Sequence, residues 1–311
     1  MPDVLTIGEA MAALRAERPL HLGGALHLTV AGAEANVAIG LSRLGHRARW
    51  VGVNGADEFG RLILRTLRAE GVDVSHAAVD EHAPTGLVIF EPRVADLVRV
   101  GYYRSGSAGS HLEPRHAAAA LEEGARIVHL TGVTPALGPG PRAAVEAAVR
   151  SSALVCLDVN HRSRLWSAHE AATVLRPLAQ HVDVLVASDD ELALVCPPHA
   201  RRESERVEAL LATGVREVVI KRGADGAEVF TATGSTSRPA VRVPVKDTVG
   251  AGDAFVAGYL SGILDGLGIP DRLERAVTTG AFAVAAAGDW EGLPFREELD
   301  LLRAAPGSTL R

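Results

Sequence analysis

The residues that carry the most recognisable chemistry lie late in the chain, at Gly250, Ala251 and Gly252. They leave the backbone bare immediately before an apolar run of helical period, residues 254–264. N–H groups at the start of a helix have no acceptor within the helix, so they can bind an anion such as phosphate. Asp253 would repel a phosphate there, but it could accept the proton of a hydroxyl group that attacks one. The alternative is that Asp253 only caps the helix and that the glycines only allow tight packing.

Short runs rich in Val, Ile and Leu alternate along the chain with segments of helical period. This alternation is typical of βαβ units, so we predict an α/β fold with a central, mainly parallel sheet and helices on both faces. The predicted helices include residues 33–45 and 57–71. The predicted strands are residues 3–7, 47–55, 126–130, 153–159, 183–187, 216–220 and 226–230.

Two segments, about residues 10–30 and 76–104, depart from this alternation. Within the second, residues 84–92 and 96–104 read as consecutive strands with no helix between them. We predict that these segments form a small β-sheet that acts as a lid. A two-stranded lid would have exposed edges, which favour pairing with a second copy of the chain.

The composition argues against several classes of protein. The chain has 311 residues, and its 32 Lys and Arg against 38 Asp and Glu give a formal net charge of −6. It has no long basic run, so we expect neither a nucleic acid nor an anionic membrane as partner. It also lacks a leader pattern and any uncharged apolar stretch of about 18 residues. Cys156 and Cys196 support neither a disulfide framework nor a zinc site, so we expect a cytoplasmic protein.

Two common nucleotide-binding motifs are missing from the sequence. The first predicted strand is followed by GEAMAALRAE and not by a G-x-G-x-x-G that opens a helix. No G-x-x-x-x-G-K-[ST] segment occurs either. A Rossmann dehydrogenase and a Walker-type kinase are therefore excluded.

The segment DTVGAGDAFVAGYLSG, residues 247–262, closely resembles the D-T-x-G-A-G-D motif of the ribokinase-like (PfkB) carbohydrate kinases. The segments AGAEANVAIGLSRLG and VGVNGADEFG resemble the Gly-rich, Asn-containing sugar-binding segment of that family. The resemblance runs from about residue 3 to 300. It implies one ribokinase-like domain over residues 1–311 that uses ATP, Mg²⁺ and, as in some relatives, a monovalent cation such as K⁺. It also implies that Asp253 is the catalytic base and that the amides of Gly250–Gly252 stabilise the transferring phosphate.

Four further stretches are most similar to 2-keto-3-deoxygluconate kinases: GYYRSGSAGSHL, HLTGVTPAL, LDVNHRSRLW and GDWEGLPFREEL. This resemblance implies that Tyr102, Arg104 and Arg162 contact the substrate or the phosphates it meets. Guanidinium groups bind carboxylates through paired hydrogen bonds, which suits a sugar acid better than a neutral sugar. On the residues alone, Arg104 could be a solvated charge and Arg162 could pair with Asp158.

The resemblance also assigns the two sides of the site. The sugar side would be made by Gly32, Glu34, Asn36 and Asp289. The nucleotide side would be made by Asn160, Arg162, Ser188, Lys221, Gly223, Gly226, Gly250 and Gly252. Asp190 and Glu191 would hold Mg²⁺ through water.

Structural explanations exist for several of these residues. Gly32 and Asn36 could simply begin a helix, and Asp289 could form a turn. Glycines between two strands, as at 223 and 226, are equally typical of a β-hairpin. Acidic residues such as Asp190 and Glu191 are also stable at a solvated helix N-terminus.

The sequence departs from the family pattern at Ala31, Val88, Phe90, Val249 and Val277. Ala31 stands in place of a glycine, and Val249 stands where many members have Thr. Val88 and Phe90 replace polar lid residues, which bears on the identity of the substrate. Val277 stands where a nucleotide-side Asn is expected.

Together these observations predict an ATP-dependent kinase that phosphorylates the terminal hydroxyl of 2-keto-3-deoxygluconate and forms a homodimer or a larger homo-oligomer. One alternative is another PfkB kinase that acts on a neutral sugar such as fructose or ribose. A second alternative is a catalytically silent sugar sensor, although such a protein would need neither Asp253 nor the anion site.

Overall fold

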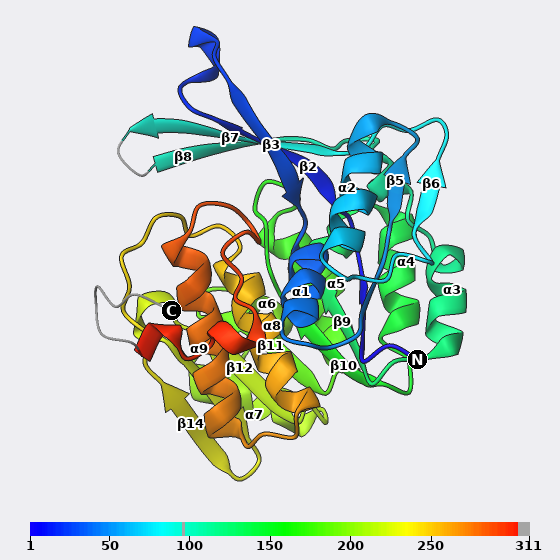
Figure 1. Ribbon diagram of the computed structural model, residues 1–311. Helices are drawn as coiled ribbons and strands as arrows, with labels where there is room; N and C mark the ends of the chain where they lie inside the picture. The colour runs from blue at the N-terminus through cyan, green and yellow to red at the C-terminus, as the bar shows by residue number, and fades with distance from the viewer. Residues whose placement is uncertain (95–96, 304–311) are drawn as a thin grey trace.

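A sheet of eight strands forms the centre of the molecule (Figure 1) in the computed structural model, which describes residues 1–94 and 97–303. From edge to edge the strands are β14 (Gly234–Arg238), β13 (Ala227–Thr231), β12 (Glu217–Lys221), β11 (Val184–Ser188), β10 (Leu154–Asp158), β9 (Ile127–Thr131), β1 (Val4–Ile7) and β4 (Ala48–Val51). The pairs from β4 to β12 are parallel, and β13 and β14 are antiparallel. The predicted α/β fold with a mainly parallel sheet is confirmed.

Helices cover both faces of this sheet, and each face has its own hydrophobic core. One core contains residues of α3 (Pro114–Glu123), α4 (Pro139–Ala148), α5 (Ala168–Ala179), α6 (Leu192–Val195) and α7 (Glu203–Ala212). The other contains residues of α1 (Ala33–Arg43), α2 (Glu58–Ala69), α8 (Ala251–Leu264) and α9 (Ile269–Ala285). Short 3₁₀ turns occupy Leu20–Leu22, Ala108–His111, Thr134–Leu137, Gly223–Asp225, Arg296–Glu298 and Leu301–Arg303.

The two cores explain why the central strands are apolar at successive positions. In β11, Leu185 packs into one core while Val184 and Val186 pack into the other. A strand that is buried on both faces cannot alternate between polar and apolar residues. Within the described part of the chain, no helix has both the length and the apolar character that crossing a membrane requires.

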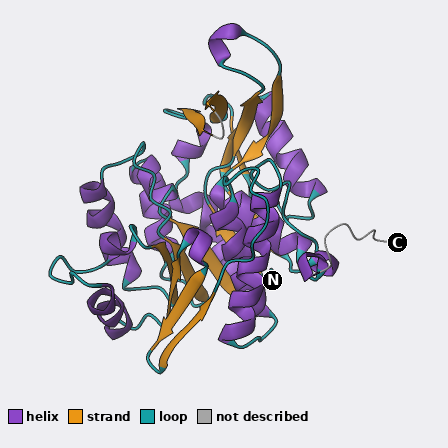
Figure 2. Ribbon diagram, turned by 90° about the vertical axis from the view of Figure 1, so that its left-hand side faces the viewer, coloured by secondary structure: helices purple, strands orange, loops and turns teal. Residues whose placement is uncertain are grey.

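The lid is a separate four-stranded sheet in the order β3 (Leu26–Ala31), β2 (Met11–Ala16), β7 (Leu87–Val94) and β8 (Leu97–Tyr103). It stands above the large sheet, as both ribbon views show (Figures 1 and 2). Residues 95–96, which fall inside the predicted lid segment, lie outside the described residues. The prediction of two strands was wrong, because β2 and β3 pair with each other and β2 also pairs in parallel with β7.

The predicted lid boundary at residue 76 was also wrong. Strand β6 (Ala78–Asp80) pairs with β5 (Val53–Gly55) in a two-stranded sheet outside the lid. The single strand predicted over residues 47–55 is divided into β4 and β5 at Gly52. A Cβ atom there would lie 2.2 Å from the Trp50 ring and 2.4 Å from the Gly8 carbonyl oxygen. The chain leaves the large sheet at Gly52, a position where only glycine fits.

The last residue of each of the neighbouring parallel strands β10, β11 and β12 is polar. These residues are Asp158, Ser188 and Lys221. The carboxyl ends of parallel strands meet at one edge of a sheet, where open α/β folds bind ligands. This edge and the inner face of the lid form the walls of the candidate site.

Candidate active site

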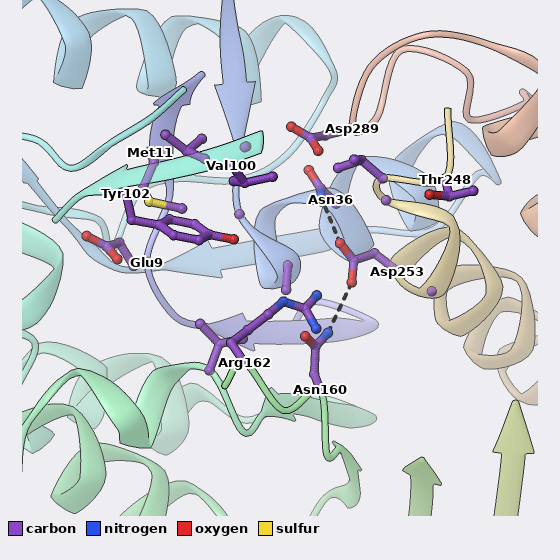
Figure 3. Close-up of a pocket in the computed structure, with 18 of the residues that line it drawn as sticks. Glu9, Met11, Asn36, Val100, Tyr102, Asn160, Arg162, Thr248, Asp253 and Asp289 are labelled. Carbon is purple, nitrogen blue, oxygen red and sulfur yellow. Dashed lines mark hydrogen bonds between the residues drawn. The ribbon is translucent and has the colours of Figure 1, made fainter. Parts of the chain in front are cut away.

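A cavity of about 460 Å³ lies between the lid and the carboxyl ends of the large sheet. Its lid side is mostly apolar and is formed by Met11, Val88, Phe90, Val100 and Tyr102. Its opposite side is polar, with Asn36, Asn160, Arg162 and Asp253 around one point (Figure 3). The cavity thus combines an apolar cover with a charged floor.

Most of the residues that we predicted for the site meet in this one cavity. Those that line it are Gly32, Asn36, Tyr102, Arg104, Asn160, Arg162, Ser188, Glu191, Lys221, Gly250, Gly252, Asp253 and Asp289. Those outside its lining are Glu34, Asp190, Gly223, Gly226 and Ala251. Residues from nearly the whole length of the chain therefore share one site.

Asp253 is buried in the first turn of α8, where two amide side chains hold its carboxylate (Figure 3). Asn36 Nδ2 donates to Asp253 Oδ2 at 2.8 Å, and Asn160 Nδ2 donates to Asp253 Oδ1 at 3.4 Å. Burial raises the pKa of Asp253 to about 6, although the Asn36 hydrogen bond and the Arg162 charge oppose the rise. Asp253 therefore has the basicity of a general base that works near neutral pH.

The backbone before Asp253 has the geometry of an anion site. Gly250 is in the left-handed conformation, with φ +75°, and a Cβ atom on it would lie 1.9 Å from the Asp289 carbonyl oxygen. The first helical bond runs from Ala254 N to Gly250 O at 2.9 Å, so the amides between them have no acceptor in the helix. A Cβ atom on Gly252 would lie 3.5 Å from Lys221 Nζ, so a cation also borders this helix start.

Asn160 is held in a strained backbone conformation. Its φ of 40° is the one positive value for a non-glycine residue within 1–94 and 97–303. Such a conformation costs about 1–3 kcal/mol, although Asn tolerates it better than most residues. In this conformation the Asn160 side chain points at Asp253, which is consistent with a functional role.

Two arginines of the cavity have different surroundings. Arg104 is buried, forms an ion pair with Glu9, and has its guanidinium carbon 5.6 Å from the centre of the Tyr102 ring. Arg162 is exposed, and its hydrogen bond runs from Nη1 to the His161 carbonyl oxygen at 3.3 Å. Neither structural alternative for these residues holds, because Arg104 is not solvated and no ion pair joins Arg162 to a described carboxylate.

The ion-pair partner of Asp158 is Lys221 and not Arg162. Lys221 Nζ lies 2.8 and 2.9 Å from the two carboxylate oxygens of Asp158. Burial alone would lower the pKa of Lys221, but the Asp158 charge and hydrogen bond outweigh it, and the pKa is raised. Lys221 therefore stays charged next to the anion site.

The predicted magnesium residues follow β11. Glu191 accepts from the backbone amides of His161 and Ser188, at 2.7 and 2.8 Å, while Asp190 accepts from Ser188 Oγ at 2.6 Å. The described residues contain no group of three or more His, Cys, Asp or Glu side chains that could hold a metal ion. These groups fit Mg²⁺ only in a form that keeps its own waters and takes further oxygens from phosphates.

Glu34 was predicted to meet the substrate, and the structure contradicts this. Its side chain is fully buried beneath the cavity and accepts from Thr131 Oγ1 and Thr134 Oγ1, both at 2.6 Å. Burial raises the pKa of Glu34 to about 7, against these two hydrogen bonds. Glu34 fastens the start of α1 to the end of β9.

Gly223 and Gly226 were predicted to border the nucleotide, but they lie outside the cavity lining. Gly226 has φ +99°, and a Cβ atom on it would lie 2.0 Å from the Arg238 carbonyl oxygen. This glycine closes the turn between β12 and β13, as the hairpin alternative proposed. Of the departures from the family pattern, Ala31, Val88, Phe90 and Val249 line the cavity, whereas Val277 is buried in α9 away from it.

Glu9 and Arg15 were not predicted from the sequence. Glu9 lines the cavity and is 3% exposed, while Ser107 Oγ donates to its Oε1 at 2.5 Å. A charged residue just after the first strand was an available signal, because strand ends carry site residues in α/β folds. Arg15 lies in a lid strand and forms an ion pair with Asp247, which no local pattern indicates.

The chain is similar to known proteins over nearly its whole length. Residues 1–296 match the family model described as pfkB family carbohydrate kinase. A 2-dehydro-3-deoxygluconokinase from Thermoproteus tenax is 39% identical, over 98% of this chain and 95% of the relative. A 2-dehydro-3-deoxygluconokinase from Bacillus subtilis is 36% identical, over 96% and 94% of the two chains.

Solved structures show the same fold. A PfkB protein from Polaromonas sp. JS666 has a TM-score of 0.85 and 35% identity, over 96% of this chain and 99% of that one. An E. coli protein provisionally assigned as a ribokinase II, in complex with ATP and Mg²⁺, has a TM-score of 0.89 and 23% identity, over 97% and 99%. The predicted ribokinase-like fold is confirmed. This chain therefore belongs to the pfkB family and is a carbohydrate kinase.

Proposed function

We propose that this kinase transfers the γ-phosphate of ATP to the terminal hydroxyl group of 2-keto-3-deoxygluconate, also called 2-dehydro-3-deoxygluconate. The observation that carries the proposal is the buried Asp253 carboxylate, held by two amides between the anion site and the guanidinium groups of Arg104 and Arg162. The names of the two relatives that are more than a third identical support this substrate.

The transfer needs a base and a site for the transferring charge. The oxygen of the sugar hydroxyl group attacks the γ-phosphorus, and Asp253 accepts the proton of that hydroxyl group. The bond between the γ-phosphorus and the bridging oxygen breaks, and that oxygen leaves with ADP. The amides of Gly250–Gly252 donate to the oxygens that gain charge, together with the Lys221 ammonium. Bound Mg²⁺ near Ser188, Asp190 and Glu191 would neutralise phosphate charge.

The substrate is held from the lid and from the sheet edge. Arg104, oriented by Glu9, and Tyr102 face it from the lid, while Asn36, Gly32 and Asp289 lie where its hydroxyl groups would bind. Arg162 has no carboxylate partner among the described residues, so its guanidinium is free to bind the substrate carboxylate or a phosphate. The lid also excludes water, which would otherwise accept the phosphate.

The whole chain works as one kinase domain in this proposal, with the four-stranded sheet as its lid. We place the enzyme in the cytoplasm, since ATP is available there and both cysteines are free and buried. A requirement for a monovalent cation such as K⁺ stays a prediction.

Replacement of Asp253 by Asn removes the base but keeps the shape of the side chain. We expect turnover to fall about 100-fold or more, with unchanged folding and ATP binding. The control is Asp271→Asn, because Asp271 also lies in the first turn of a helix but is exposed. For the unmodified enzyme, kcat should fall as the pH drops through about 6, where Asp253 gains its proton. Unchanged turnover in Asp253→Asn would refute Asp253 as the base and favour another mechanism, whereas a wild-type protein without any turnover would favour the silent sensor.

Replacement of Gly250 by Ala tests the anion site. Its Cβ would collide with Asp289, so we expect turnover to be lost along with the shape of the loop. Gly266→Ala is the matched control, because Gly266 has φ +73° and no atom within 4 Å of a Cβ. That control should lower the free energy of unfolding by about 1 kcal/mol and keep activity. Equal activity losses in the two variants would show that backbone strain, and not the anion site, is responsible.

Substrate identity is tested by ADP release with Mg-ATP on a panel of 2-keto-3-deoxygluconate, its galactose epimer, fructose, ribose and adenosine. We expect turnover on the keto-deoxy acids alone. Arg162→Met should then raise KM for the acid at least about tenfold. Arg164→Met, on the same exposed loop, should not. Turnover on a neutral sugar alone would favour the alternative PfkB activity, which the apolar Val88 and Phe90 in the lid would suit.

The outer face of the lid suits contact with a second copy of the chain. Leu26 and Leu28 of β3 are both 43% exposed, and Leu22 in the nearby 3₁₀ turn is 57% exposed. A groove of about 450 Å³ beside Ile89 and Tyr103 is also lined by the charged residues Glu91, Arg93 and Arg99. Apolar surface gathered on one sheet face is typical of an interface. We therefore expect a homodimer joined through the lids.

Light scattering after gel filtration measures this directly. The wild-type mass should be twice the chain mass of 32.5 kDa, and Leu28→Glu should lower it. Val245→Glu is the control, because Val245 is 64% exposed but lies outside the lid. A monomeric wild type, or a dimer that Leu28→Glu leaves intact, would contradict the lid interface.

A further inference from the structure

Arg15 reaches from the lid to the two loops at the phosphate-binding end of the cavity. Arg15 lies in β2, two residues after Ala13, which packs in the lid cluster with Val88 and Phe90. Side chains two residues apart on a strand point to the same face, so Arg15 also projects from the inner face of the lid. Its Nη1 lies 2.6 Å from Asp247 Oδ2, and its Nη2 lies 3.6 Å from Asp289 Oδ1. The side chain is only 18% exposed, so these charges are shielded from solvent.

Both carboxylates belong to loops that shape the anion site. Asp247 Oδ1 accepts from Val249 N at 3.0 Å, directly before Gly250. The Asp289 carbonyl oxygen occupies the space that a Cβ on Gly250 would need. Arg15 therefore joins a lid strand to each of the two chain segments that meet at Gly250.

The lid has two further contacts at this junction. The guanidinium carbon of Arg15 lies 4.2 Å from the centre of the ring of Phe90, which lines the cavity. Thr29 of β3 donates to Glu291 Oε1 at 2.6 Å. The position of the lid and the position of the loop at Asp289 are thus coupled through several side chains.

Asp289 has unused hydrogen-bonding capacity at the cavity. It is 3% exposed and lines the cavity, and its Oδ2 atom has no hydrogen-bond partner in the structure. A buried carboxylate oxygen without a donor is costly. A sugar hydroxyl group in the cavity would supply that donor.

We propose that Arg15 is a positioning residue for the kinase reaction, which keeps the Asp289 carboxyl group directed at a substrate hydroxyl group while it joins the lid to the loops of the anion site. The inference rests on the proposed sugar-kinase function but not on which sugar is the substrate. Arg15 touches neither the cavity nor the reacting atoms, so it acts through Asp289 and Asp247.

The charges around Asp289 support this role. Burial raises the pKa of Asp289 to about 7, and Arg15 opposes that rise. The other charged groups that face it are Glu291 on the same loop, Asp253 on α8 and Asp247, and all three raise its pKa. Loss of the Arg15 charge would raise the pKa of Asp289 further, so that less of it would be ionised near neutral pH.

The test compares Arg15→Met, which removes the charge, with Arg15→Lys, which keeps it. KM for the sugar is measured from pH 6 to 9 with whichever panel sugar the wild-type enzyme phosphorylates best, so a wrong substrate assignment leaves the experiment intact. For a rise of about one pKa unit, we expect Arg15→Met to raise KM about fivefold over the wild-type enzyme at pH 7, and less at pH 9. Arg15→Lys should restore most of the loss.

The matched control is Arg61→Met, since Arg61 is 72% exposed on α2 and pairs with its helix neighbour Glu58. It should leave KM unchanged at every pH. If Arg15→Met does not fold, Arg15→Gln replaces it, because Gln keeps N–H donors without the charge. A KM that is unchanged, or raised by the same factor at every pH, would overturn the proposal and leave Arg15 a structural role.

Discussion

The burial of one carboxylate at the start of a helix governs the rest of this site. In the proposed mechanism, Asp253 lies beside amides that attract negative charge, yet it must stay a base and leave those amides to the phosphate. Asn36 and Asn160 resolve this conflict, because their amide groups hold the two carboxylate oxygens in place. One comes from α1 and the other from the strained end of β10, so the helix, the sheet edge and the first βαβ unit must all be assembled before the base is in position.

Several charged residues in and around the cavity form ion pairs. Glu9 accompanies Arg104, Asp158 accompanies Lys221, and Arg15 stands between Asp247 and Asp289. Removing one member of such a pair leaves a buried charge without a partner. The resulting loss of stability is larger than the net stability that the intact pair contributes. Of the cations that line the cavity, Arg162 has no described carboxylate as an ion-pair partner, and this makes it the cation best suited to an incoming anion.

The lid adds an apolar cover to this polar floor. Met11, Val88 and Phe90 form a small hydrophobic cluster that is separate from the two cores of the large sheet. The ion pairs of Arg15 and the hydrogen bond of Thr29 connect this lid to the loops near Gly250. In the proposed mechanism these contacts join the part that excludes water to the part that binds phosphate.

The sequence by itself determined the fold class and indicated Asp253 and the glycines before it as the proposed base and anion site. These depend on local order: apolar runs with the period of a strand or of a helix, and glycines directly before a helix. It also indicated Asn36, Arg104 and Arg162 through short motifs. Tertiary structure alone decided which residues face the cavity. Glu34 belongs to the same motif as Asn36 yet points into the core, because successive positions of a helix face different directions. Glu9, Arg15 and the Lys221–Asp158 pair depend on contacts between residues far apart in the chain, and no local pattern of residue types encodes such a distance.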